Sequence, residues 1–140
     1  MKEEAFLEIK TEQIDLNGNI DLVEFKTKVE ILRKKDYIYI KYEGSEVLNT
    51  EGTTNLIKVE DNIVTMKKMG KNSTTMIFEE NKRYKTIYGT ELGFLPMEIL
   101  PEVVDINISK DLKKTLIKIE YNICIIGIFE GKNIITMRFL

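Results

Sequence analysis

The chain of 140 residues contains no histidine and no tryptophan, and it has a single cysteine, Cys124. The absence of histidine removes the commonest general base and the commonest metal ligand of proteins. One cysteine cannot form an internal disulfide or, by itself, a thiolate metal site. We therefore expect no catalytic residues, no metal site and no cofactor. A lone cysteine is also typical of a protein of the reducing cytoplasm.

Long apolar runs and a strong charge of one sign are missing too. No segment approaches the ~18 apolar residues of a membrane-spanning helix, and the N-terminus lacks the apolar run of a signal peptide. The 21 basic and 23 acidic side chains give a net charge of -2 and are mixed along the chain. The basic residues between positions 67 and 85 are accompanied by Glu79 and Glu80, which favours a solvated surface. We expect a cytoplasmic protein with no nucleic-acid partner and no membrane association.

The sequence is rich in alternation of apolar and polar residues. Every second residue from Ile117 to Ile125 is apolar, and the residues between them are mostly polar. This period of two indicates a β-strand with one face against a core. Further segments with strand-forming composition or the same alternation cover residues 5–14, 21–32, 37–42, 53–60, 63–69, 73–80, 83–88 and 133–140.

Turn residues separate these segments. Asn17-Gly18 is the strongest hairpin signal among them. The stretch 89–112 is interrupted by glycines and by Pro96 and Pro101, and each proline removes a donor from a β-ladder. We predict short edge strands near 93–99 and 103–109, with a short helical turn as the alternative.

The strands predict an all-β fold in a single domain over residues 1–140. Roughly nine or ten antiparallel strands follow one another with tight connections. Closure into a single up-and-down β-barrel of about eight to ten strands removes exposed sheet edges and is the favoured architecture. A two-sheet sandwich is the alternative. No internal repeat of propeller or solenoid length is visible.

A set of segments in this order resembles one known family. The segments are YIYIKYEGSE at 37–46, TTNLIKV at 53–59, VTMKKMG at 64–70, MIFEENKR at 76–83 and YKTIYG at 84–89. They resemble the YwiB-like proteins, small bacterial cytoplasmic proteins classed as a domain of unknown function. The resemblance implies a calycin-like β-barrel, related to the lipocalin-like barrels that often hold one small ligand. At Lys68 the family more often has arginine, and lysine lacks arginine's planar fork for anions.

Five polar residues lie on the face of their strands that we expect to point inward: Lys68, Tyr84, Thr86, Tyr88 and Thr27. If these faces line one interior, the barrel holds a cation, several hydroxyls and apolar walls, which suits a small ligand. In the alternative interpretation, Lys68 pairs with a carboxylate or reaches the barrel mouth near Gly70. A barrel of about eight strands can also be filled by its own side chains.

Two functions remain open on this basis. The first is a non-enzymatic β-barrel that binds a small acidic or apolar ligand in its interior. The second is a structural or protein-interaction module with a fully packed interior, which contacts a protein partner through an exposed edge or through segment 89–112. A cavity of several hundred Å³ would favour the first function, and a filled barrel the second.

Overall fold

The computed structural model describes residues 2–44, 52–70 and 73–140. These residues form ten β-strands, and the described ranges contain no helix, so none that could span a membrane. The strands are β1 (Lys2–Asp15), β2 (Ile20–Arg33), β3 (Tyr37–Glu43), β4 (Thr53–Glu60), β5 (Ile63–Gly70), β6 (Thr74–Phe78), β7 (Tyr84–Thr90), β8 (Gly93–Asn107), β9 (Leu116–Ile125) and β10 (Phe129–Phe139).

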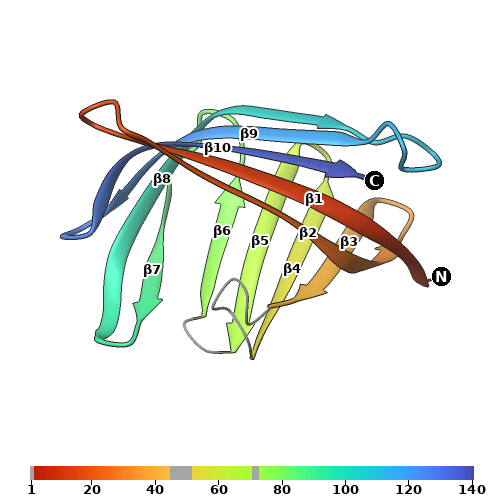
Figure 1. Cartoon of the computed structure of the whole chain (residues 1–140), viewed down its shortest axis with the longest axis horizontal. Coiled ribbons are helices and arrows are strands. Elements are labelled where there is room, and N and C mark those ends of the chain that lie inside the picture. The colour runs from red at the N-terminus through yellow and green to blue at the C-terminus, as the bar shows by residue number, and fades with distance from the viewer. Residues whose placement is uncertain (1, 45–51, 71–72) are drawn as a thin grey trace.

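All ten strands belong to one antiparallel sheet with the order β6-β5-β4-β3-β2-β1-β10-β9-β8-β7. The two ends of this order, β6 and β7, follow each other in the chain and lie side by side (Figure 1). The backbone N–H of Gly89 donates to Thr74 Oγ1 at 3.5 Å across this β6–β7 seam. The sheet is therefore curved into a nearly closed barrel. The predicted up-and-down barrel is confirmed, and the two-sheet sandwich is not formed.

The inward faces of the strands form one apolar core. On β9 the residues of the alternating pattern, from Ile117 to Ile125, are all buried, as predicted. Burial of one such aliphatic side chain stabilises the fold by about 1.5–3 kcal/mol. The fully buried side chains from the other strands are Leu7, Val29, Ile31, Ile40, Ile57, Val64, Phe78, Ile99, Pro101 and Met137.

The first hairpin shows how local sequence sets a turn. The Asp15 carboxylate accepts hydrogen bonds from the backbone N–H groups of Asn17 at 2.9 Å and Asn19 at 3.0 Å. Gly18 has a φ of 84°, a left-handed conformation that glycine adopts without steric penalty. The Asn17-Gly18 turn predicted from the sequence is confirmed, and the β1–β2 ribbon projects from the barrel at the upper left of Figure 1.

The prediction for segment 89–112 is only partly right: residues 93–99 and 103–107 are strand as predicted, but they belong to one continuous strand that does not lie at the edge of the sheet. Its central part is one long strand, β8, that pairs with β7 on one side and β9 on the other. Pro96 lies just before the β9 ladder begins at Met97, and Pro101 lies just beyond the end of the β7 ladder at Ile99. Each proline thus occupies a point where only one ladder runs, so a long strand tolerates both. The turn predicted at Gly70–Asn72 extends beyond the described residues.

Candidate functional site

A pocket of about 130 Å³ opens on the inner side of the barrel wall formed by β3, β4, β5, β6 and β7. We call it the Lys68 pocket. Its polar lining comes from one cross-strand row, from β7 and from the exposed Lys67 of β5: Tyr42, Asn55, Lys67, Lys68, Thr74 and Tyr88. Its apolar lining includes Ile57, Met66 and Met76.

The register of the sheet explains why these polar side chains meet. Tyr42 on β3 lies opposite Asn55 on β4, Asn55 lies opposite Lys68 on β5, and Lys68 lies opposite Thr74 on β6. Neighbouring strands are about 4.8 Å apart, so the four side chains form a continuous polar row on one face. The next row toward the barrel centre is apolar, and its members are Ile40, Ile57, Met66 and Met76.

Lys68 is partly buried, and its position on β5 places it on the same face as the fully buried Val64. It forms no ion pair or hydrogen bond with another of the described residues. The carboxylate partner considered in the alternative interpretation is thus not found in residues 2–44, 52–70 and 73–140. No carboxylate in this part of the chain competes with an external anion for the ammonium group.

The row also carries two hydroxyl groups, that of Thr74 next to Lys68 and that of Tyr42 beyond Asn55. Burial raises the pKa of Tyr42 to about 12, so its hydroxyl stays protonated at neutral pH. Thr74 already accepts the hydrogen bond from Gly89 across the β6–β7 seam, and its own hydroxyl proton can still be donated. The pocket therefore combines the inward Lys68 ammonium group, several hydrogen-bond donors and an apolar floor, and Lys67 also lines it. In the described part of the chain, no three Cys, Asp or Glu side chains are grouped to hold a metal ion.

Lys68 and Tyr88 are the two predicted site residues that line the Lys68 pocket. Tyr84 and Thr86 share the inner face of β7 with Tyr88, because all three lie opposite inward residues of β8. Tyr84 packs against the core, and Thr86 borders a different hollow beside Met97. Their role in ligand binding stays a prediction.

Thr27 lies on the inner face of β2, opposite the fully buried Leu7. It borders a separate hollow of about 260 Å³ at the point where β2 and β3 diverge. Its hydroxyl donates to the carbonyl oxygen of Lys28 at 3.4 Å. The structure does not bring Thr27 into the Lys68 pocket, and its predicted contact with a ligand stays a prediction.

Asn55, Thr74 and Tyr42 line the pocket, and sequence reasoning did not select them. The signal existed for Asn55, which alternates with Ile57 on the inner face of its strand. Its position beside Lys68, however, depends on the β4–β5 register. Periodicity gives the face of a residue and not its neighbour on the next strand.

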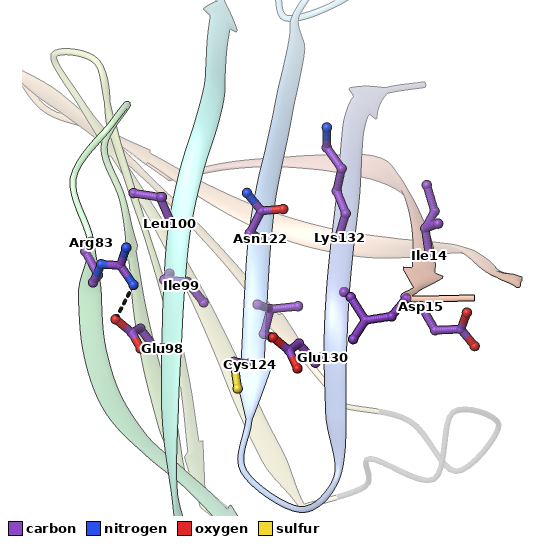
Figure 2. Close-up of a pocket in the computed structure, with 13 residues that line it drawn as sticks. Ile14, Asp15, Arg83, Glu98, Ile99, Leu100, Asn122, Cys124, Glu130 and Lys132 are labelled. Atoms are coloured by element: carbon purple, nitrogen blue, oxygen red, sulfur yellow. Dashed lines mark hydrogen bonds and ion pairs between the residues drawn. The ribbon is translucent and has the colours of Figure 1, made fainter. Parts of the chain in front are cut away.

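A larger hollow of about 570 Å³ lies on the outer face of β8, β9 and β10, next to the end of β1. Figure 2 shows this outer groove, with Arg83 and Glu98 at one side, Lys132 toward the other and Cys124 between them. Cys124 is a free, partly exposed thiol on the outward face of β9, as predicted from its alternation.

Both cations of the outer groove are already paired. Arg83 Nη1 lies 2.6 Å from Glu98 Oε1, and Lys132 Nζ lies 3.6 Å from Glu102 Oε2. A ligand anion would compete with these carboxylates. The outer groove is therefore a poorer anion site than the Lys68 pocket, although it is larger.

The contribution of the Arg83–Glu98 pair to the stability of the fold should depend on pH. The hydrogen bond and charge of Arg83 lower the pKa of Glu98 below its ordinary value of 4.5. Because the folded pKa lies below the unfolded one, the pair stabilises the fold above the unfolded pKa. This contribution is lost as the pH falls through the folded pKa. Arg83→Gln should raise the pKa of Glu98 toward 4.5, as measured by carboxyl ¹³C NMR titration.

Lys82→Gln is the control for this titration, because Lys82 pairs with Glu79 at 2.9 Å instead. It should leave the pKa of Glu98 unchanged. If Arg83→Gln also left that pKa unchanged, Arg83 would not be its cause.

Comparisons with known proteins give a family and a fold. The family model described as "Domain of unknown function (DUF1934)" matches residues 7–137. The crystal structure of the YwiB protein from Bacillus subtilis is similar, with a TM-score of 0.81 and 19% sequence identity. The alignment covers 99% of this chain and 93% of that one. At this identity the likeness shows the fold alone. No curated protein matches the sequence.

Proposed function

The chain belongs to the DUF1934 family of domains of unknown function, and on that premise we propose that it is a non-enzymatic cytoplasmic protein that binds a small carboxylic acid in the Lys68 pocket. One observation carries the proposal. Lys68 points into the barrel, is partly buried, and has no ionic partner among the described residues. A bound carboxylate would supply the missing charge.

The pocket suits a short acid. A carboxylate can accept hydrogen bonds from the Lys68 ammonium group and from the Thr74 hydroxyl, which sits opposite it in the register. The carbon chain would then contact Met66 and Met76 in the next row. At about 130 Å³ the pocket does not reach the several hundred Å³ that would favour a ligand by size alone. The proposal therefore rests on Lys68 and is confined to acids of a few carbon atoms. Flexible methionine side chains allow modest enlargement.

The same residues support a binding role rather than a catalytic one. A general base works best with a pKa near the operating pH. Tyr42, with its pKa raised to about 12, is protonated at neutral pH and is no such base. The described residues that line the pocket include no carboxylate.

A second candidate function is the recognition of a protein partner by the outer surface. Several large apolar side chains are more than half exposed, and they include Leu16, Ile87, Leu92, Phe94 and Ile126. Exposed apolar groups of this kind can mark an interaction surface. This candidate prevails if no acid binds.

A thermal-shift screen tests the proposal with formate, acetate, propionate, butyrate and lactate, each compared with its neutral amide. An acid present at about 100 times its Kd should stabilise the native protein by about 2.7 kcal/mol. Lys68→Met should keep the fold, because the side chain lines a pocket mouth, and should abolish the shift caused by the acid. The amides should cause no shift.

Lys118→Met is the matched control, because Lys118 is exposed on the outer face of β9. It should bind the acid like the wild type. An equal thermal shift in Lys68→Met and in the wild type would show that the acid does not bind in the Lys68 pocket. The absence of any shift in the wild type would refute the proposed ligand class.

A further inference from the structure

Strand β2 has a long free edge on the side that faces β3. β1 pairs with β2 along nearly its whole length, from Ile20 to Leu32. The ladder between β2 and β3, in contrast, covers only residues 30–33 of β2. Residues 20–29 therefore have no strand on this side within the described part of the chain. Figure 1 shows this part of β2 running from the β1–β2 turn at the upper left toward β3.

The free edge belongs to a well-supported part of the sheet. β1 pairs with β2 on one side and with β10 on the other, as far as Asp15 opposite Gly131. The unpaired backbone N–H and C=O groups of such an edge are a template for another strand. Bulges and prolines can block an edge. The β1–β2 ladder has no register shift, and residues 20–29 contain no proline. The edge is thus open to pairing.

Apolar side chains are exposed along this edge. Leu22 on the outer face is 51% exposed, and Val23 on the inner face is 46% exposed. Ile20, next to the turn, is 63% exposed. Contiguous exposed apolar groups mark interaction surfaces. A strand added beside β2 would cover part of each of these side chains.

The charges of this segment fit a second copy of the same strand. When two copies pair antiparallel about a two-fold axis, side chains of the same face lie opposite each other, and one residue faces its own copy. With Glu24 or Lys26 at this centre, like charges would meet, which is destabilising. With Val23 at the centre, the Asp21 carboxylate would face Phe25. With Phe25 at the centre, each Glu24 lies opposite Lys26 of the second copy.

The charged groups and the space that this register needs are available. Glu24 forms no ion pair within the described residues. Lys26 approaches Glu8 only to 4.0 Å, and its side chain is 65% exposed. The register also places Leu22 of the second copy opposite Lys28, which borders the hollow of about 260 Å³ between β2 and β3. This hollow leaves room for the end of the second strand.

We propose that the β2 edges of two copies of this chain pair antiparallel, centred on Phe25, and form a homodimer. Backbone hydrogen bonds between the two edges supply attraction, as in other cases of strand addition. The Glu24–Lys26 pair, which occurs twice by symmetry, selects the register. The Lys68 pocket lies on β3–β7, so the dimer does not depend on the proposed function. Lys68→Met should leave dimerisation unchanged.

Sedimentation velocity of the full chain at micromolar concentrations tests the dimer. Glu24→Lys and Lys26→Glu each bring like charges opposite one another and should each weaken dimerisation about tenfold or more. The double variant Glu24→Lys/Lys26→Glu restores opposite charges and should dimerise like the wild type. A mixture of the two single variants should form heterodimers, because one chain then carries two cations at these positions and the other two anions.

Lys118→Glu is the matched control, because it reverses an exposed charge on the outer face of β9, away from the β2 edge. It should dimerise like the wild type. A monomeric wild type would overturn the dimer and leave the edge to an extended segment of another protein. Single variants that dimerise like the wild type, or that form no heterodimer when mixed, would contradict the register centred on Phe25.

Discussion

Phe78→Ala is expected to lower the free energy of unfolding by about 3–5 kcal/mol, the usual loss for a fully buried aromatic residue. Phe78 has no exposed surface and lies opposite the equally buried Val64. Its ring contacts Tyr121 of β9, although β6 and β9 are not neighbours in the sheet. The side chain thus joins two strands that do not pair, on either side of the β6–β7 seam.

Urea denaturation followed by circular dichroism measures this loss. Phe94→Ala is the matched control, because Phe94 is 72% exposed on the outer face of β8. Its free energy of unfolding should change by no more than about 0.5 kcal/mol. Similar losses in the two variants would mean that Phe78 is not a core residue.

Gly131→Ala is expected to destabilise the fold by about 3 kcal/mol or more, because it overpacks a rigid contact. The added Cβ atom would collide with the backbone oxygen of Ile14 and would lie 3.1 Å from the Cα of Asp15. Both atoms belong to the backbone of β1, whose ladder with β10 ends at this point. Neither atom can move away without breaking that ladder.

Gly18→Ala separates this clash from the ordinary effect of losing a glycine. Gly18 has a φ of 84°, but a Cβ atom added there would meet no other atom within 4 Å. Its substitution should cost only about 1–2 kcal/mol of conformational strain. A chemical denaturation series should rank Gly131→Ala well below Gly18→Ala in stability. The reverse order would contradict the close approach of β1 to β10.

Alternation in the sequence predicted most of the strands and their buried faces. The β9 pattern shows why, since one face must be apolar over the whole strand to cover a core. Turn chemistry was equally local, as in the Asp15 carboxylate that holds the Asn17-Gly18 turn. Such features depend on neighbours in the chain, which a sequence displays directly.

The errors have a different origin. Proline lacks an N–H donor, so Pro96 and Pro101 predict breaks in a strand. The consequence of that missing donor depends on whether a neighbouring strand faces it, and this is decided by the register and the lengths of β7 and β9. The seam between β6 and β7 also depends on closure of the whole sheet.

Only part of the candidate site could be predicted, because the sequence shows the face of a residue but not its neighbours on the next strand. The inward direction of Lys68 follows from its alternation with Val64 and Met66. The position of Lys68 beside Asn55 and Thr74 follows only from cross-strand register. Alternation predicts the correct face for Thr27, but this residue lies at the β2–β3 divergence and not in the Lys68 pocket.

A crystal structure with the acid that gives the largest thermal shift tests the proposed binding most directly. We expect a carboxylate within hydrogen-bonding distance of Lys68 Nζ and the Thr74 hydroxyl, with its carbon chain against Met66 and Met76. A carboxylate bound instead beside Arg83 in the outer groove, with the Lys68 pocket empty, would contradict this expectation.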